Sequence, residues 1–198
     1  MKIAIIDYGA GNVQSVLFAI ERLGYSAVVT ADKEEIITAD YVIFPGVGEA
    51  SFAMRKLESL GLVSVIKNLK QPVLGICLGM QLLCAFSEEG DTAGIGIFDL
   101  KVQKFSEDLK VPQVGWNTIT DLKNELFEGI AANAFMYLVH SYYVPMNAHA
   151  ISTTSYGVDY ATAIQKDNFY GVQFHPEKSG AVGSQIIKAF LNIKTTNA

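Results

Sequence analysis

Short hydrophobic runs alternate with helical patterns through the first half of the chain. Apolar runs of four to six residues are typical of buried strands, and apolar residues spaced three and four apart are typical of amphipathic helices. This alternation predicts an α/β protein with a doubly wound, mainly parallel sheet and helices on both faces. The expected strands lie at 3–6, 26–29, 41–44 and 73–76, and the expected helices at 13–23, 33–36, 51–57, 62–69 and 78–86. Asn12 and Asp32 are the expected N-caps of the first two helices.

The second half of the chain has a different pattern, in which strand-like segments follow one another with short polar or glycine-containing turns. It predicts an antiparallel or mixed extension of the sheet. A final helix is expected at 184–191, and the polar tail at 194–198 is expected to fray. We expect one domain that covers residues 1–198. The strand-like segments are 100–104, 116–120, 135–139, 150–155, 161–165 and 170–174.

Composition narrows the class of protein. Half of the 198 residues are hydrophobic, 18% are charged, and the net charge is −5. This balance predicts a well-cored globular protein and gives no support for a nucleic acid or an anionic membrane as partner. No apolar run approaches the roughly 20 residues that span a bilayer, and the N-terminus turns acidic too early for a signal peptide. The two cysteines of the chain are expected to be reduced, and this predicts a cytoplasmic location.

A glycine-flanked cysteine follows the fourth expected strand, in the segment Gly75-Ile76-Cys77-Leu78-Gly79. A sharp turn from strand to helix with a nucleophile at its apex crowds the backbone, and glycines on both sides relieve that crowding. The following helix directs free N–H groups at the sulfur, which favours the thiolate. Cys77 is therefore a candidate nucleophile. The second cysteine, Cys84, lies among apolar residues and is expected to be a buried hydrophobe, too far along the helix from Cys77 for a disulfide.

A cysteine nucleophile needs a base, and His175 follows an apolar strand in the segment Gly171-Val172-Gln173-Phe174-His175-Pro176-Glu177. In extended backbone, residues two apart point the same way, so Glu177 can orient the His175 ring. Both Cys77 and His175 come at the carboxyl ends of strands, where sites collect in parallel sheets. Each residue alone is more often structural than functional. Together they predict a Cys–His–Glu triad.

Two loops also follow strands. Pro45-Gly46-Val47-Gly48 can turn backbone N–H groups toward an oxyanion, and the N–H of Leu78 is the natural second donor.

The segment Asp7-Tyr8-Gly9-Ala10-Gly11-Asn12 fails the dinucleotide template, because Gln14 stands where the third glycine is required. We find no P-loop sequence and no Cys/His pair with zinc spacing. We therefore expect no cofactor and no metal.

At these residues the chain resembles the class I, or triad, glutamine amidotransferases. The most specific matches are GICLGMQLL around Cys77 and GVQFHPEKS around His175 and Glu177. Within the class, the chain is similar to the glutaminase subunits of imidazole glycerol phosphate synthases. The segments that carry this closer resemblance are DYGAGN at 7–12, PGVG at 45–48, VPQVGWN at 111–117 and VHSYY at 139–143.

The resemblance implies that Cys77 attacks the glutamine side-chain amide, that His175 protonates the departing ammonia, and that water releases glutamate from a thioester. It implies that Gln81, Ser141 and Tyr142 bind the amino-acid part of glutamine. It places Gly46 and Gly48 near the carbonyl and makes the N–H of Val47 an oxyanion donor. The implied partner is a (β/α)₈-barrel cyclase in a heterodimer, and the implied docking residues are Asn12, Trp116, Asn117 and Tyr137.

Free ammonia would be protonated in water near neutral pH, and a single domain has no room for a second active site. This is an independent argument for a synthase partner. Two alternatives remain open. The ammonia acceptor can differ, as in anthranilate, aminodeoxychorismate or pyridoxal phosphate synthases, although GWN and HSYY argue against these. The chain can also be a non-catalytic binding module on the same fold, although such a module is expected to lose a triad member.

Overall fold

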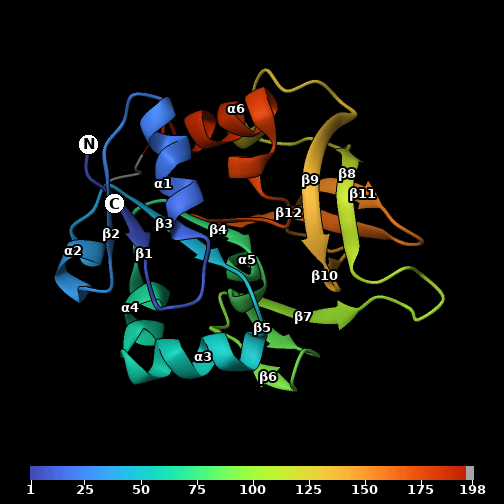
Figure 1. Cartoon of the computed structure of the whole chain (residues 1–198), viewed down its shortest axis with the longest axis horizontal. Helices are drawn as coiled ribbons and strands as arrows, with labels where there is room; N and C mark the ends of the chain where they lie inside the picture. The colour runs from blue at the N-terminus through green and yellow to red at the C-terminus, as the bar shows by residue number, and fades with distance from the viewer. Residues whose placement is uncertain (195–198) are drawn as a thin grey trace.

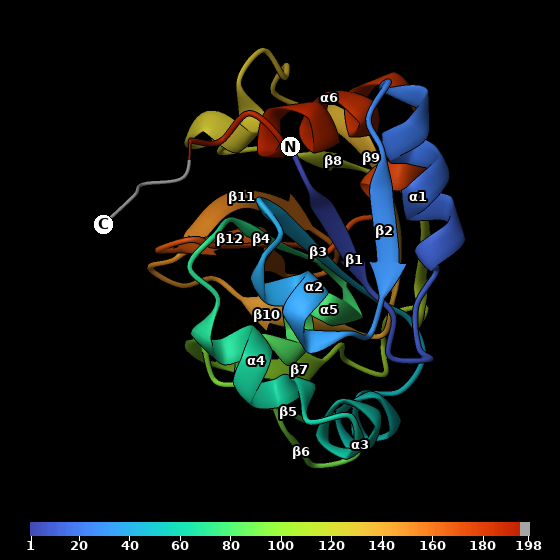
Figure 2. The ribbon, with the colours of Figure 1, turned by 90° about the vertical axis from the view of Figure 1, so that its left-hand side faces the viewer.

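In the computed structural model, which describes residues 1–194, a twisted sheet lies between two layers of helices (Figure 1 and Figure 2). The predicted fold class is confirmed. The elements of the first half are β1 (Ile3–Ile6), α1 (Val13–Arg22), β2 (Ala27–Thr30), α2 (Lys33–Ile37), β3 (Tyr41–Gly46), α3 (Ala50–Ser59), α4 (Leu62–Asn68), β4 (Val73–Cys77) and α5 (Leu78–Leu82).

The second half consists mainly of strands, as predicted. Its elements are β5 (Cys84–Ser87), β6 (Thr92–Ala93), β7 (Phe98–Lys104), β8 (Gln113–Ile119), the 3₁₀ turn η1 (Glu125–Phe127), β9 (Ala134–His140), β10 (Tyr142–Pro145), β11 (Ala150–Ser155), β12 (Asp159–Lys166), β13 (Phe169–Val172), the 3₁₀ turn η2 (Pro176–Lys178) and α6 (Gly180–Phe190). The end of the tail that was expected to fray, residues 195–198, lies outside the described residues.

The strands of the main sheet run in the order β2-β1-β3-β4-β13-β12-β10-β7-β5-β6, and β11 pairs with β12. The strands from β2 to β13 are parallel, and β12 and β10 extend the sheet in antiparallel pairing. Strand β13 therefore comes late in the sequence but lies directly beside β4. This neighbour relation brings the end of β13 to the same sheet edge as the end of β4.

Each face of the sheet has its own apolar core. Helices α1 and α6 cover one face with side chains such as Ile20 and Phe190, and α2 to α5 cover the other with side chains such as Leu57 and Met80. These side chains are buried, as the helical spacing of apolar positions predicts. Among residues 1–194, no helix combines the length and the apolar character that a membrane crossing needs.

The helix expected at 78–86 is wrong in its length. Helix α5 ends at Leu82, and residues 84–87 form strand β5 instead. Backbone pairing with a distant segment explains the change, because Ile95 and Ile97 donate hydrogen bonds to the carbonyls of Leu82 and Leu83. The separation of the two cysteines is therefore not set by a continuous helix, as the prediction assumed. Both cysteines are nevertheless free, and Cys84 is a buried hydrophobe, as expected.

The two predicted N-caps differ. Asp32 accepts a hydrogen bond from the Glu35 N–H at 2.9 Å, which is the expected capping contact. Asn12 stands at the N-cap position of α1, but its side-chain oxygen accepts from the Ser15 hydroxyl at 2.8 Å and caps no backbone N–H.

Strands β8 and β9 form a separate two-stranded antiparallel sheet on the side of the molecule that carries α6 (Figure 1). One face of this pair turns Leu138 and Met136 into the core shared with α6. The other face turns Trp116 and Tyr137, which are directly paired, outward. The sequence predicted these two strands but not that they leave the main sheet.

Candidate active site

Cys77 ends strand β4 and directly precedes helix α5. Its backbone has φ 54° and ψ −112°, a conformation that side chains other than glycine rarely adopt. Strained residues at a strand-to-helix turn are the mark of a nucleophile elbow. The structure therefore has the local geometry that the glycine-flanked cysteine predicted.

The two flanking glycines are required by space. A Cβ atom on Gly75 would lie 2.8 Å from the backbone nitrogen of Met80, and a Cβ on Gly79 would collide with the carbonyl oxygen of Phe44. Helix α5 can therefore approach strands β3 and β4 closely only because these positions lack side chains. This close approach fixes the direction in which the elbow presents the Cys77 sulfur.

His175 follows β13 at the same sheet edge, and its backbone N–H donates to the Tyr137 carbonyl at 2.9 Å. Its Nδ1 atom lies 2.8 Å from Oε1 of Glu177, and both side chains are almost completely buried. A carboxylate only accepts hydrogen bonds, so Nδ1 carries a proton and Nε2 is left for the Cys77 side. Among residues 1–194, Nε2 of His175 and Oε2 of Glu177 have no hydrogen-bond partner.

The pKa of His175 reflects opposing effects. Burial lowers the pKa, whereas contacts with the Cys77 sulfur and the Glu177 carboxylate raise it, and the net result is a pKa of about 10. The imidazole is thus strongly basic and holds a proton at neutral pH. Such a group can take a proton from a thiol and later deliver it to a leaving group.

A cavity of about 260 Å³ opens beside the Cys77 sulfur. It has room for a small molecule of amino-acid size. The walls come from six separate segments of the chain, and Cys77 and His175 both belong to the lining. Its lining residues are Val47, Gly48, Cys77, Leu78, Gln81, Glu89, Pro112, Val139, His140, Ser141, Tyr142 and His175.

Most of the predicted site residues meet at this cavity. Val47, Gly48, Leu78, Gln81, Ser141 and Tyr142 line it together with Cys77 and His175. Glu177 lies behind the His175 ring, away from the cavity wall. Gly46 is buried within β3 and pairs with Cys77, so it adjoins the elbow without lining the cavity.

Two residues at the site were not predicted from the sequence. Gln173 is completely buried and donates from Nε2 to the Cys77 sulfur at 3.6 Å. Glu89 lines the cavity and accepts from the Ala50 N–H at 2.9 Å. Gln173 stands two residues before His175, so the period-two spacing that linked His175 to Glu177 could have found it. Glu89 follows β5, a strand whose residues had the pattern of a helix.

His140 both lines the site and has a structural role. It lines the cavity, and its Nδ1 lies 2.8 Å from the Tyr142 carbonyl oxygen. Burial, partly offset by this hydrogen bond, lowers the pKa of His140 to about 4. His140 is therefore a neutral ring that fixes the corner between β9 and β10.

The predicted docking residues lie in two places. Trp116 and Tyr137 face each other across β8 and β9 with ring centroids 6.0 Å apart. Asn117 is next to Trp116 but turns the other way, and its side chain donates to the Ser155 carbonyl at 3.0 Å. Asn12 precedes α1, and its side chain contacts Ser15 and not the aromatic pair.

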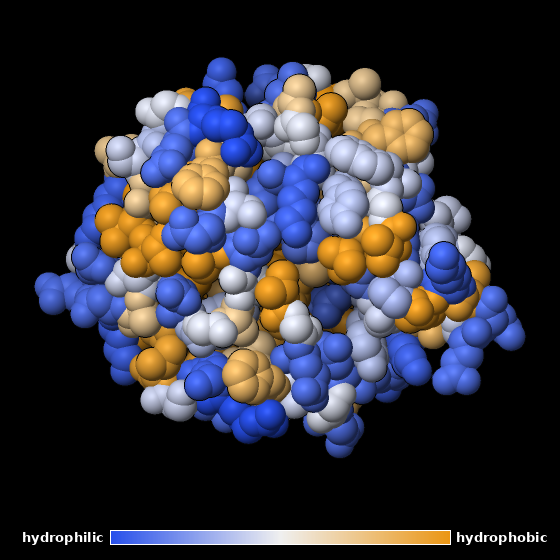
Figure 3. Space-filling model, in the orientation of Figure 1, coloured by the Kyte–Doolittle hydropathy of each residue, from blue (hydrophilic) through white to orange (hydrophobic). Residues whose placement is uncertain are grey.

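The surface around the pair is apolar. Trp116 is 56% exposed, and Val114 and Phe135 on the same strands are exposed to a similar extent. The space-filling view shows apolar side chains reaching the surface on the face that carries β8 and β9 (Figure 3). We call the outward side chains of Val114, Trp116, Phe135, Tyr137 and Val139 the β8–β9 ladder.

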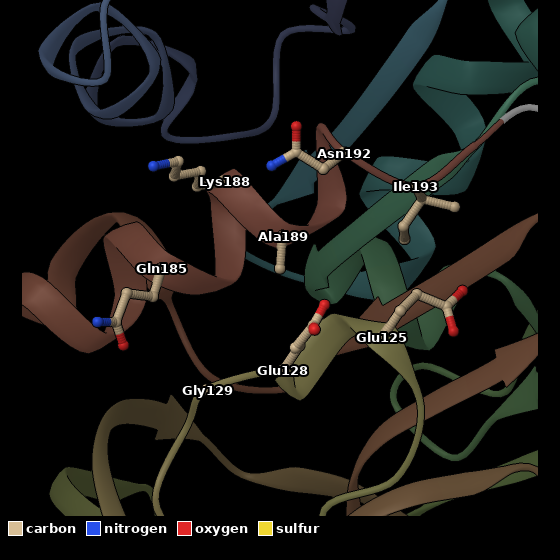
Figure 4. A pocket seen from close by; sticks show the side chains of 8 residues that line it. All are labelled: Glu125, Glu128, Gly129, Gln185, Lys188, Ala189, Asn192 and Ile193. Atoms are coloured by element: carbon tan, nitrogen blue, oxygen red, sulfur yellow. The ribbon is translucent and has the colours of Figure 1, made fainter.

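A second cavity of about 300 Å³ lies between α6 and η1, away from Cys77 (Figure 4). Glu125 and Glu128 approach it from η1, and Lys188 and Asn192 approach it from α6 and its end. It lacks a cysteine or histidine, so it offers no nucleophile–base pair. Among residues 1–194, no group of three or more histidine, cysteine, aspartate or glutamate side chains is arranged to hold a metal ion.

The chain is similar to known proteins over nearly its whole length. The family model described as "Glutamine amidotransferase class-I" matches residues 4–193. Curated relatives named "Imidazole glycerol phosphate synthase subunit HisH" cover nearly the full chain. The one from Bacteroides fragilis is 54% identical over 98% of this chain and 100% of its own length, and the one from Haemophilus influenzae is 48% identical over 96% of this chain and 97% of its own.

Solved structures show the same fold at low sequence identity. A crystal structure described as a glutamine amidotransferase has a TM-score of 0.75 at 15% identity, with 96% of this chain and 96% of that one covered. PurLQS from Thermotoga maritima has a TM-score of 0.71 at 16% identity, with 96% and 97% covered.

Proposed function

Because this chain belongs to the class-I glutamine amidotransferase family, we propose that it is the glutaminase subunit of an imidazole glycerol phosphate synthase. It hydrolyses glutamine and passes ammonia to a cyclase subunit, which makes imidazole glycerol phosphate and an aminoimidazole carboxamide nucleotide in histidine biosynthesis. The observation that carries the proposal is the cavity at which Cys77 and His175 meet, with Glu177 hydrogen-bonded behind His175. The relatives named above support the choice of synthase.

The reaction starts from an ion pair in which the Cys77 thiol proton has already moved to Nε2 of His175, the ring nitrogen that Glu177 leaves free. The sulfur then attacks the side-chain amide carbon of glutamine. His175 gives the proton to the amide nitrogen, the carbon–nitrogen bond breaks, and ammonia leaves behind a glutamyl thioester. His175 next takes a proton from water, the resulting hydroxide displaces the sulfur, and glutamate departs.

Negative charge develops on the amide oxygen in each addition step. Leu78 begins α5, so its N–H is not used by the helix's own hydrogen bonds and is free to donate. We assign the second donor to Val47, which lines the same cavity as Leu78. Each such donor contributes roughly 3 kcal/mol to transition-state stability.

The rest of the cavity suits an amino acid. We assign the α-amino group of glutamine to Glu89, because it is the one carboxylate among the described lining residues. Ser141 and Tyr142 offer backbone groups to the α-carboxylate, and Gln81 and Gly48 complete the wall. Gly46 supports the loop from within β3. No metal and no cofactor takes part in the chemistry that we propose.

The partner docks on the β8–β9 ladder. Val114, Trp116 and Phe135 of this strip are each more than half exposed, and exposed aromatic residues are enriched at interfaces. It also adjoins the site, because Tyr137 packs against the His175 ring with centroids 6.5 Å apart. A (β/α)₈-barrel cyclase docked there receives ammonia without its release to water. Asn12 and Asn117 belong to the rim of this interface.

We further propose that residues 1–198 act as one domain and that the heterodimer works in the cytoplasm. Free thiols at Cys77 and Cys84 are consistent with a reducing compartment.

The test is an assay of ammonia and product release with the purified chain and with its complex with the cyclase, in the presence of the cyclase's nucleotide ligand. We expect glutamine-dependent synthesis in the complex and a weak glutaminase without the cyclase. Cys77→Ala should abolish synthesis from glutamine and leave synthesis from ammonium salts intact. Cys84→Ala is the matched control, because it removes the other thiol without touching the cavity.

Three outcomes would contradict the proposal. Loss of ammonium-dependent synthesis in Cys77→Ala would mean that the residue is structural. Failure of a glutamine-derived chloroketone to label Cys77 in the complex would favour a non-catalytic binding module. Association with a chorismate-binding subunit in place of the cyclase would keep the glutaminase chemistry and change the ammonia acceptor.

A further inference from the structure

Gln173 is a polar side chain that the reaction described above does not use. It directly follows β13, and its backbone N–H donates to the Thr162 carbonyl at 2.8 Å. In the register of β13 with β4, Val172 lies opposite Ile76, so Gln173 comes level with Cys77. The side chain is 0% exposed and makes two hydrogen bonds, one to the Cys77 sulfur and one with Gln81.

The direction of these hydrogen bonds follows from one carbonyl group. The Tyr142 backbone oxygen can only accept, so the Gln81 side-chain atom 2.9 Å from it is the nitrogen. That nitrogen has a second hydrogen, which points to Gln173 at 2.8 Å. The Gln173 atom that receives it is therefore the oxygen, and the Gln173 nitrogen faces the Cys77 sulfur at 3.6 Å. A flipped Gln173 amide would place two donors against each other.

The Cys77 sulfur thus has two polar neighbours that favour opposite protonation states of the sulfur. The Val139 carbonyl oxygen, at 3.8 Å, accepts from the protonated thiol. The Gln173 N–H donates, and a donor favours the anionic sulfur. A donor also lowers the energy of the sulfur when it leaves the thioester as an anion, since both steps pass through the same charge.

We infer that Gln173 is a positioning residue, which holds a hydrogen-bond donor on the Cys77 sulfur and is itself aligned by Gln81 and the Tyr142 carbonyl. This inference rests on the proposed role of Cys77 as the nucleophile. The chain of contacts also links the sulfur to the β9–β10 corner, where Tyr142 lines the cavity.

Other titratable groups face the sulfur and belong in any account of its pH dependence. His175 follows β13 and is hydrogen-bonded to Glu177 of η2. Tyr8 lies in the loop after β1. The cavity wall adds His140 from β9, Glu89 after β5, and Tyr142 from β10. Burial raises the pKa of Tyr8 far above neutrality, and burial lowers that of His140, so both are uncharged near pH 7.

The test measures the rate at which iodoacetamide alkylates Cys77 as a function of pH in the purified full-length chain, with the modified residue identified by mass spectrometry. Gln173→Met keeps the side-chain length and removes the donor. We expect the pH midpoint of alkylation to rise by about one pH unit. This is a tenfold change in the ionisation equilibrium of the sulfur, which is about the contribution of one hydrogen bond to a charged atom. In the complex, kcat for glutamine hydrolysis should fall by a similar factor with little change in KM.

Two further variants complete the design. Gln81→Met leaves Gln173 in place but removes the group that aligns it, so the midpoint should rise by a smaller amount. Gln185→Met is the matched control, because Gln185 is exposed on α6 and far from Cys77. The pH midpoint of Cys77 alkylation in this variant should equal that of the wild type. Circular dichroism and the unfolding midpoint establish that each variant is folded.

The outcomes separate this inference from the proposed function. If Gln173→Met is folded and its alkylation midpoint equals that of the wild type, the inference is wrong while Cys77 remains the nucleophile. If Gln173→Met does not fold, a wild-type midpoint in folded Gln81→Met has the same meaning. If Cys77 of the wild type does not react with iodoacetamide at any pH, both the inference and the proposed function fail.

Discussion

Nδ1 of His175 and Oε1 of Glu177 lie 2.8 Å apart in a part of the protein where both side chains are shielded, with 2% and 1% of their surfaces exposed. Because the two residues are separated by one proline in a 3₁₀ turn, their spacing is set by the local backbone. Glu177 therefore fixes the ring orientation and the protonated nitrogen without contacting the cavity.

This relationship predicts an order of effects for two substitutions. His175→Ala removes the proton carrier and should lower kcat for glutamine hydrolysis by about a thousandfold or more. Glu177→Gln keeps an oxygen that can accept from Nδ1 and loses only the charge, so a loss of roughly ten- to hundredfold is expected. Steady-state assays of the synthase complex, with ammonium-dependent synthesis as the control for folding, measure both. A larger loss in Glu177→Gln would refute the assignment.

A second prediction concerns the β8–β9 ladder. Trp116 is 56% exposed and makes an edge contact with Tyr137, so truncation removes a large apolar anchor with little effect on the core. Trp116→Ala should weaken binding of the cyclase by about ten- to hundredfold and leave the unfolding free energy nearly unchanged. Isothermal titration calorimetry measures the affinity.

The matched control is Ile37→Ala. Ile37 is 55% exposed, but it lies on α2, at the other end of the molecule from β8 (Figure 1). Wild-type affinity is expected for this variant. Equal weakening by both substitutions would indicate non-specific loss of apolar surface, and no weakening by Trp116→Ala would place the docking face elsewhere.

The sequence predicted what depends on local pattern. The β–α alternation, the elbow at Cys77 and the Asp32 cap follow from neighbours in the chain, and all three are present. The pairing of β13 with β4 could not be read locally, although the placement of chemistry at strand ends implied a common edge. The helix expected to continue to residue 86 failed because the 94–98 segment supplies backbone hydrogen bonds to residues 82–85. Propensity alone cannot weigh such distant partners.

The candidate site likewise contains residues that the local sequence predicts and residues that it does not. Residues in contiguous motifs, such as Cys77, His175 and Glu177, were found from spacing and residue type. Gln173 and Glu89 were missed, because the contacts that give each a role at the cavity join segments far apart in the sequence. Period-two spacing places Gln173 on the same side as His175, but it does not show that the amide contacts the Cys77 sulfur.

A third prediction tests the space beneath the elbow. A Cβ on Gly79 would overlap the Phe44 carbonyl oxygen, and its other nearest neighbours are backbone atoms of Phe44 and Pro45, which cannot move aside as a flexible side chain can. Gly79→Ala should therefore lower the free energy of unfolding by about 3 kcal/mol or more. Gly11→Ala is the control, because its Cβ would lie 3.4 Å from the Pro45 oxygen, an ordinary contact, and a change within about 1 kcal/mol is expected. Urea denaturation measures the free energy of unfolding of both variants. Equal losses in the two variants would contradict the steric argument.

The last prediction concerns the acid stability that His140 controls. Burial is the main cause that lowers the pKa of His140 to about 4, and the charge of His175 adds to it, whereas the hydrogen bond to Tyr142 opposes both. The unfolded chain has an ordinary histidine pKa near 6.5 and so binds more protons than the folded chain between about pH 4 and 6.5. Stability must therefore fall as the pH drops through this window, by at most about 1.4 kcal/mol per pH unit from this residue.

The His140→Asn variant isolates that contribution, since an asparagine amide can still donate to the Tyr142 carbonyl but does not titrate. His175 contributes equally to the wild type and the variant, because with a folded pKa of about 10 it loses its proton near pH 6.5 only in the unfolded chain, so the difference between the two slopes reports His140. Urea unfolding at about pH 4.5, 5.5, 6.5 and 7.5 should show a shallower loss of stability in His140→Asn than in the wild type. Identical slopes would mean that the His140 ring gains a proton in the folded protein as readily as in the unfolded chain, and its fixed neutral state at the β9–β10 corner would then be wrong.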